Sequence, residues 1–340
     1  MPQFMITTRK RGDDRAMGPA RYLTFEDEAG PEQDLGTNPR RWLAQIMAGF
    51  DPPQAGNRVD PVRSGDVLFL VHGFNVSHAS ARSFHMKCVE GLAAAGWRGQ
   101  VISYDWPSDG LVFAYLDDRK KARDAADELV SAGIAVLQQA QQADCTIGVH
   151  VLAHSMGGFV VQQAFTWSYQ DVPPDWRIGQ ILFASADVDH SVFSADTVTA
   201  KAFGRHGGRV TAYCNRYDKA LAASNAKRLE LAPRMGRVGL PDDAPALMCE
   251  VDCSGFFAEH YVAITDLLSP VVTHCFYFDQ PVFWEDVTLT LAGGIDRSVF
   301  PTRGDGPAAN RFALKAADRT IYAQALARAA TSLSIHPPPP

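Results

Sequence analysis

The sequence lacks the features typical of membrane-spanning and nucleic-acid-binding chains. No window holds the roughly 18 consecutive apolar residues that a membrane span needs, so we expect no membrane span. The 32 Lys and Arg residues are outnumbered by 38 Asp and Glu residues, which gives a net charge of −6. Nucleic acid is therefore not an expected partner, because phosphate binding needs a basic surface. The segment from Met1 to Arg11 lacks the apolar run of a signal peptide, and we expect a cytoplasmic protein.

Cysteine is scarce, with six residues in a chain of 340. A chain of this length does not need disulfides, and we expect reduced thiols packed in the core. Cys249 and Cys253 have the wrong spacing for a zinc knuckle and no second CxxC or HxxxH pair lies near them, so no metal site is expected. No GxGxxG or GxxxxGK[ST] segment follows a predicted strand, which argues against a nucleotide-dependent enzyme, and no cofactor is expected.

From Asp66 onward, short apolar runs alternate with longer helical patterns. The predicted strands cover residues 67–71, 100–106, 146–153, 180–186, 209–214 and 246–252. Two β-prone runs at 3–7 and 21–25 predict an antiparallel hairpin at a sheet edge. Strands that are apolar throughout are covered on both faces, so the pattern predicts an α/β fold with a mainly parallel sheet.

The segment 117–142 carries an apolar stripe with spacings of mostly three and four, which predicts an amphipathic helix packed on the sheet. The stripe consists of Ala122, Ala126, Leu129, Ile134, Leu137 and Ala140. A second amphipathic helix is predicted over 309–333, and it could pack on its own domain or on a second copy in a homo-oligomer.

The chain is divided by these patterns into three regions. Residues 1–60 form an N-terminal hairpin and helix joined to the core, and 61–295 form the core domain, where 187–208 and 231–245 lack clear periodicity and could cap the site. Residues 296–340 form a C-terminal extension with a helix, and its last residues, Pro337–Pro340, are expected to be disordered.

The segment Ala153, His154, Ser155, Met156, Gly157, Gly158 directly follows a predicted buried strand and precedes a helical pattern. This is the GxSxG nucleophile elbow with alanine in place of the first glycine. In that motif the serine occupies a strained turn, and small neighbours are needed because backbone passes close on both sides. The alternative is an ordinary helix start in which Ser155 is the N-cap.

A second feature favours the elbow. The strand at 67–71 is followed by His72, Gly73 and Phe74, an HG-type turn that places a backbone N–H opposite an elbow. An oxyanion hole needs two fixed donors, and the candidates are the N–H groups of Phe74 and Met156.

The HGF turn, the AHSMGG elbow and their order on successive strands resemble the α/β-hydrolases of the carboxylesterase and lipase type. The segments HGFN, YDWPSDG, HSMGG, SADVD, NRYDKAL and THCFYF further resemble an uncharacterised bacterial hydrolase branch, a domain of unknown function, over about residues 60–295. The resemblance implies the α/β-hydrolase fold, with a sheet of about eight strands and helices on both faces. It also implies the chain order Ser, acid, His.

This order directs the search for the acid downstream of Ser155. Asp218 lies in the turn after the strand at 209–214, where the superfamily usually carries its acid, and it would orient the histidine and stabilise the imidazolium. Asp218 could instead cap the helix that follows it. Asp187 and Asp189, after the preceding strand, form the rival acid position.

For the base, His274 lies between the last predicted strand and a helical segment, and it matches the histidine loop of the family. His260 is the alternative base. The reaction implied is hydrolysis of a small-molecule carboxylic ester of small or medium apolar character through an acyl-enzyme, with no cofactor. An amidase, thioesterase or acyltransferase on the same triad, or a hydrolase-like scaffold that binds without catalysis, are the alternatives.

Overall fold

The computed structural model describes residues 2–50, 63–108, 115–139, 145–168, 176–227, 232–261, 264 and 267–333. The predicted disordered tail, Pro337–Pro340, lies outside these residues, as do Leu231 and residues 51–60 of the predicted boundaries. The chain forms two compact units. Unit 1 comprises Met1–Val89, Arg98–Ile181 and Lys201–Gly208, and unit 2 comprises Glu90–Trp97, Leu182–Ala200 and Arg209–Pro340.

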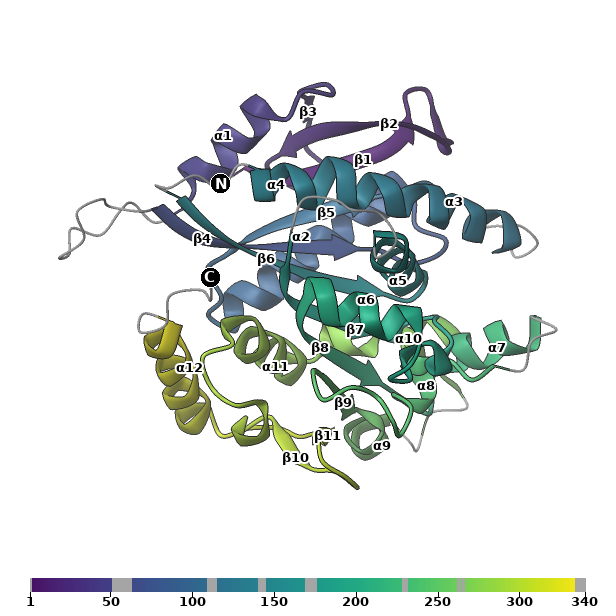
Figure 1. Cartoon of the computed structure of the whole chain (residues 1–340), viewed down its shortest axis with the longest axis vertical. Coiled ribbons are helices and arrows are strands. Elements are labelled where there is room, and N and C mark those ends of the chain that lie inside the picture. Colours follow the sequence, from purple (N-terminus) through teal and green to yellow (C-terminus); the bar gives the residue numbers. More distant parts are fainter. Residues whose placement is uncertain are drawn as a thin grey trace. The chain divides into compact units, whose positions relative to one another are not determined.

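Unit 1 is built on strands in the order β6-β4-β5-β1-β2-β3 (Figure 1). Their bounds are β1 (Gln3–Lys10), β2 (Asp13–Phe25), β3 (Glu32–Asp34), β4 (Arg63–Val71), β5 (Gln100–Asp105) and β6 (Cys145–His154). β4 is parallel to β5 and β6, and β5 is parallel to β1, whereas β2 is antiparallel to β1 and β3. The predicted hairpin is thus present next to the edge of the sheet, and the edge strand itself is β3, which pairs with β2.

Helices cover both faces of this sheet. They are α1 (Arg40–Ala48), α2 (His78–Ala94), α3 (Tyr115–Glu128), a π-helical turn η2 (Leu129–Ile134), α4 (Ala135–Gln139) and α5 (Met156–Ser168). Successive β2 residues face opposite sides: Leu23 packs with Ala81 of α2, whereas the Tyr22 hydroxyl donates to the carbonyl of Ala132 in η2 at 2.9 Å. The predicted arrangement of helices on both faces is confirmed here.

The helix predicted over 117–142 is present as the continuous run α3-η2-α4. The five predicted stripe residues that the structure describes with their side chains, Ala122, Ala126, Leu129, Ile134 and Leu137, are all fully buried. Ile134 is five positions after Leu129, a spacing that turns an α-helix away from its buried face. The wider π turn lies over this interval and keeps both side chains inside.

Unit 2 contains β8 (Gly207–Cys214), which begins in unit 1, followed by β9 (Met248–Asp252), β11 (Arg311–Leu314) and β10 (Arg303–Asp305) in sheet order. β9 is parallel to β8 and β11, and β10 is antiparallel to β11. The helix predicted over 309–333 therefore begins only at Arg319, because 311–314 form the strand β11, which pairs with β9 and β10.

The helices of unit 2 are mostly short. They are η3 (His190–Phe193), α7 (Lys219–Lys227), α8 (Met235–Val238), α9 (Ser254–Tyr261), α10 (Pro270–Cys275), η5 (Phe276–Asp279), α11 (Pro281–Ala292), η6 (Arg297–Val299) and α12 (Arg319–Leu333). Two further elements, β7 (Ile178–Ala184) and α6 (Val198–His206), begin in one unit and end in the other. Regular structure in 187–208 is thus provided by η3 and α6, where the sequence shows no clear periodicity.

A buried ion pair joins α11 to β10 in unit 2. Asp286 and Arg303 are 0% and 4% exposed, and Arg303 Nη2 donates to Asp286 Oδ1 at 2.7 Å. The hydroxyls of Tyr213 and Thr302 also donate to this carboxylate, at 2.7 and 2.6 Å. The carboxylate therefore has a donor for both of its oxygens, as a buried charge requires.

None of the helices within the described ranges has the length and apolar character that crossing a membrane requires. Four of the six cysteines, Cys88, Cys214, Cys249 and Cys253, are buried free thiols, and Cys275 is a half-buried one.

Candidate active site

Ser155 occupies the turn between β6 and α5, where the sequence predicts an elbow. Its φ is 55°, in the left-handed region that residues other than glycine rarely adopt. A serine that only capped the helix would have an extended backbone. The turn therefore has the strained form of an elbow, and Ala153 before it is fully buried in β6.

Close backbone packing surrounds this turn. A Cβ atom at Gly157 would lie 2.3 Å from the Val71 carbonyl oxygen and 2.6 Å from that of His72. A Cβ atom at Gly73 would lie 2.6 Å from Ser155 Cβ and 3.1 Å from its Oγ. Both glycines are needed because the turn after β4 packs directly against the serine turn.

The two predicted oxyanion donors belong to these same segments. Phe74 follows Gly73 in the bend after β4, and the next residue, Asn75, has a φ of 57°. Met156 is the first residue of α5, and N–H groups in the first turn of a helix have no acceptor within the helix. The segments that carry Phe74 and Met156 therefore meet at Ser155.

Asp218 and His274 form a buried pair in unit 2. Nδ1 of His274 lies 2.6 Å from Oδ2 of Asp218, and the two residues are 8% and 0% exposed. Burial by itself lowers the pKa of His274, but the charge and hydrogen bond of Asp218, with the charge of Asp187, outweigh it and raise the pKa above its ordinary value. Because a carboxylate accepts the Nδ1 proton, the tautomer and ring orientation of His274 are fixed.

Asp218 is an N-cap as well as the partner of His274. Its Oδ1 accepts the N–H of Leu221 at 2.8 Å, in the first turn of α7. The two alternative roles predicted for this residue are thus compatible, since each uses a different carboxylate oxygen.

Thr273 holds the helix that carries His274 against the turn that carries Asp218. Its Oγ1 accepts the N–H of Lys219 at 3.1 Å and donates to the carbonyl of Pro270 at 3.0 Å. Its own carbonyl accepts the side-chain amide of Asn215 at 3.3 Å. His274 lies near the end of α10, rather than in the predicted loop, and α10 is capped by Ser269, whose Oγ accepts the N–H of Val272.

The rival acids, Asp187 and Asp189, bind other groups. Asp187 is 4% exposed, its Oδ1 lies 3.4 Å from Nε of Arg234, and both its oxygens accept from Ser224 Oγ at 3.2 Å. Asp189 caps the short helix η3 by accepting the N–H of Ser191 at 2.9 Å.

His260, the alternative base, is exposed on α9. Its Nδ1 lies 2.8 Å from the carbonyl oxygen of Phe256 in the preceding helical turn, and its ring stacks on that of Phe256. The histidine that the structure brings to Asp218 is His274.

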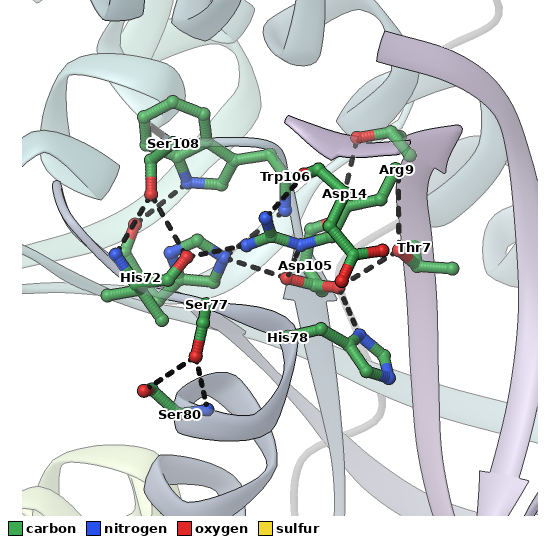
Figure 2. Close-up of polar contacts among 12 residues, drawn as sticks. Thr7, Arg9, Asp14, His72, Ser77, His78, Ser80, Asp105, Trp106 and Ser108 are labelled. Atoms are coloured by element: carbon green, nitrogen blue, oxygen red, sulfur yellow. Dashed lines mark hydrogen bonds and ion pairs between the residues drawn. The ribbon is translucent and has the colours of Figure 1, made fainter. Parts of the chain in front are cut away.

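A buried polar cluster around Asp105 lies beside the turn after β4, and local sequence patterns do not predict it. Asp105 is fully buried at the end of β5 and contacts Arg9, His72 and His78 (Figure 2). The only local signal is a charged residue at the end of an otherwise apolar strand. Among the residues that the structure describes, no group of three or more His, Cys, Asp or Glu side chains is arranged to hold a metal ion.

A family described as "Alpha/beta hydrolase of unknown function (DUF900)" matches residues 55–269. The match includes Phe74, Ser155 and Asp218 and ends before His274. No curated protein sequence matches the chain.

Several solved structures are distantly similar. A protein from Lactobacillus plantarum WCFS1 described as a cell surface hydrolase is 13% identical, with a TM-score of 0.33, over 56% of this chain and 82% of its own. A chain from a structure described under the metagenome-derived lipolytic enzymes LipS and LipT gives 12% identity and a TM-score of 0.30 over 66% of this chain and 100% of its own. The thioesterase RedJ from the prodiginine pathway of Streptomyces coelicolor gives 14% identity and a TM-score of 0.27 over 66% of this chain and 92% of its own.

Proposed function

This chain belongs to the alpha/beta hydrolase family of unknown function (DUF900), and on that premise we propose that it is a serine hydrolase that cleaves a carboxylic ester of small or medium apolar character. The proposal rests on the backbone conformation of Ser155, which has a φ of 55° in a sharp turn between a strand and a helix. Such a turn exposes a serine hydroxyl to a substrate while keeping its neighbours out of the way.

In the proposed reaction, Ser155 Oγ attacks the carbonyl carbon of the ester while His274 takes the hydroxyl proton. The electron pair of the C=O bond moves onto oxygen, and the N–H groups of Phe74 and Met156 stabilise the resulting oxyanion. When the C=O bond re-forms, the bond to the alcohol breaks and His274 returns the proton to the leaving oxygen. Water, deprotonated by His274, then hydrolyses the acyl-serine by the same steps.

The buried pair in unit 2 supports the roles of base and acid. With Nδ1 of His274 bound to Asp218, Nε2 is the nitrogen that exchanges the proton in this mechanism. Asp218 then stabilises the imidazolium that forms.

The test is a fluorophosphonate probe combined with turnover of short p-nitrophenyl esters. We expect the wild-type protein to be labelled at Ser155 and Ser155→Ala to lose both labelling and turnover while its circular dichroism is unchanged. Ser185 offers a matched control, because it also follows a strand and has a positive φ of 47° but is fully buried. Ser185→Ala should therefore keep the label and the activity.

Parallel assays with amides and thioesters of the same acyl group identify the preferred leaving group. Turnover of esters at a higher kcat/KM than amides and thioesters supports the esterase assignment, and the reverse ranking moves the proposal to an amidase or thioesterase. A folded wild-type protein that neither reacts with the probe nor turns over any of these compounds contradicts catalysis and leaves a binding scaffold.

A further inference from the structure

The Asp105 carboxylate is the centre of a buried polar cluster that joins four segments of unit 1 (Figure 2). Oδ1 accepts from Arg9 Nε at 2.7 Å and lies 3.2 Å from His72 Nε2. Oδ2 accepts from the Thr7 hydroxyl at 2.9 Å and from His78 Nδ1 at 2.7 Å. Each oxygen therefore accepts from a residue of β1 and also contacts a histidine at one end of a single short loop.

That loop is the segment 72–78, which runs from the end of β4 to the start of α2 and carries Phe74. His72 is its first residue and His78 its last, so a single carboxylate contacts both ends. His72 is held further by Trp106, whose indole N–H donates to the His72 carbonyl at 2.9 Å and whose ring stacks on the imidazole. The separation between the two ends of the loop is thus set by contacts to one buried group.

The middle of the loop is held through Val76. Its carbonyl accepts from Arg9 Nη2 at 2.7 Å and from the Ser108 hydroxyl at 3.2 Å, and its N–H donates to Ser108 Oγ at 3.1 Å. Arg9 spans the cluster, because its Nε binds Asp105 while its Nη1 donates to the carbonyl of Asp14 at 2.8 Å. The planar guanidinium fixes these three directions relative to one another.

Neighbouring charges and hydrogen bonds keep the buried carboxylate ionised. Burial by itself raises the pKa of Asp105, but hydrogen bonds from His72 and His78 and the charge of Arg9 outweigh burial and hold the pKa below its ordinary value. Burial likewise lowers the pKa of His78, but its hydrogen bonds to Asp105 and Glu32 raise it to about 9. At neutral pH the cluster therefore contains an anion between two cations, and each is hydrogen-bonded.

We propose that Asp105 and Arg9 are positioning residues for the oxyanion hole, which hold the loop 72–78 so that the Phe74 N–H is fixed before substrate binds. The inference rests on the proposed serine-hydrolase function. Phe74 is two residues from both His72 and Val76, the loop positions that the cluster holds. Gly73 between them packs on Ser155, so movement of this loop changes the position of the donor relative to the nucleophile.

Holding the loop matters for catalysis because the Phe74 N–H stabilises the oxyanion fully only if it does not have to move when negative charge develops on the substrate oxygen. A loop free to shift by about 1 Å loses much of this effect. The substrate itself does not touch Asp105, so loosening the loop should raise the energy of the transition state and leave binding of the uncharged ester nearly unchanged.

The main test uses Asp105→Asn, with kcat expressed per Ser155 site titrated by a fluorophosphonate at a temperature well below unfolding. We expect kcat to fall by about 10- to 100-fold, with KM within about twofold of wild type, since removing an oxyanion donor outright costs about 10²–10³. A boronic acid that forms a tetrahedral anion on the serine should lose affinity by a similar factor. A residue with only a structural role would lower the unfolding temperature without changing kcat per titrated site.

Asp286→Asn is the matched control. Asp286 is also fully buried and bound by an arginine, but its contacts are with Tyr213, Thr302 and Arg303 in unit 2. The Asp286→Asn variant should be less stable than wild type but keep the wild-type kcat per titrated site. Ser108→Ala provides a second variant if Asp105→Asn does not fold, because it leaves the ion pair intact and removes the hydrogen bonds to Val76. It should lower kcat several-fold with KM unchanged.

The outcomes separate the two proposals. Wild-type protein that is inert to the fluorophosphonate rejects the serine-hydrolase function and this inference with it. Wild-type protein that is labelled and active, with Asp105→Asn or Ser108→Ala equal to it in both kcat and boronate affinity, rejects the positioning role alone. Equal losses in Asp105→Asn and Asp286→Asn also reject it, since the effect would then be that of any broken buried ion pair.

Discussion

Asp218 binds His274 through one carboxylate oxygen and caps α7 through the other, with distances of 2.6 Å to His274 Nδ1 and 2.8 Å to the Leu221 nitrogen. The cap fixes the carboxylate in the turn after β8, so the second oxygen is presented to the imidazole without further ordering of the side chain. A substitution of Asp218 can therefore remove the charge of the side chain while keeping its position. An asparagine can replace the cap, because its amide oxygen is also a good N-cap acceptor, but it cannot replace the charge.

Asp218→Asn should lower activity more than Asp187→Asn does, whereas Asp187→Asn should lower stability more. Loss of the Asp218 charge should lower kcat on the order of 10³–10⁴-fold, as expected when the partner of a catalytic histidine becomes neutral, and leave unfolding close to wild type. Asp187→Asn removes the carboxylate beside the buried guanidinium of Arg234, so it should reduce stability more and kcat far less. Ester turnover and urea unfolding of both variants check this, and a larger loss of kcat in Asp187→Asn would move the acid to Asp187.

The pH dependence of turnover gives an independent check on His274. The base must be neutral to accept a proton, and its pKa lies above the ordinary 6.5 because Asp218 outweighs burial. The acidic limb of kcat/KM should therefore have its midpoint above 6.5 in the wild type. In Asp218→Asn, His274 stays buried but loses the carboxylate charge that raises its pKa. The acidic limb of the remaining activity should therefore move to lower pH. An unchanged midpoint would show that another group controls this limb.

Local sequence patterns predicted the parts of this molecule that depend on neighbours in the chain. The six predicted strands after Asp66 correspond to β4 to β9, because each is a short apolar run bounded by polar turns. The elbow at Ser155 was predictable for the same reason: strand, small residue and helix follow one another within a few positions. Asp218 and His274 are predictable only from the chain order of a family, since 56 positions separate them.

The Asp105 cluster was beyond such reasoning. Its members come from β1, the loop after β4, the start of α2 and the end of β5, and Thr7 and Asp105 are 98 positions apart, so no window of sequence contains the pattern. The sequence places His72 in the HG-type turn but gives no sign of its contact with Asp105, because that partner is remote in the chain. Only the register that places Thr7 beside Asp105 across the parallel strands β1 and β5 brings these charges together.

Glycine at position 157 should be irreplaceable, in contrast to a glycine of unit 2. A Cβ at Gly157 meets two backbone carbonyl oxygens, which cannot rotate away, so Gly157→Ala should destabilise by about 1–3 kcal/mol and reduce turnover. At Gly255 in α9 a Cβ meets nothing within 4 Å. Gly255→Ala should keep full activity and be neutral or more stable by up to about 1 kcal/mol, because alanine loses less backbone entropy in a helix. Thermal unfolding and ester turnover of the two variants measure the contrast, and equal behaviour would contradict the close approach at the elbow.

Two histidines of α2 should show opposite pH dependence of stability. The pKa of His78 is raised to about 9 by Asp105 and Glu32 despite burial, so folding is favoured by its protonation. That contribution is complete below pH 6.5, the ordinary value, and is lost as the pH rises through about 9. Burial instead lowers the pKa of His85 to about 3, so the folded state excludes the proton that the unfolded chain binds below pH 6.5.

Urea unfolding of wild type, His78→Gln and His85→Gln across pH 5 to 10 distinguishes these cases. The free-energy advantage of wild type over His78→Gln should be largest at the acidic end and shrink toward pH 10, whereas its advantage over His85→Gln should grow as the pH rises toward 6.5 and then level off. Glu32→Gln removes one of the two carboxylates that face His78, the other being Asp105, and should move the loss of stability to lower pH. A pH-independent difference between wild type and His78→Gln would mean that this imidazole carries no charge in the cluster, and Asp105 would then be balanced by Arg9 alone.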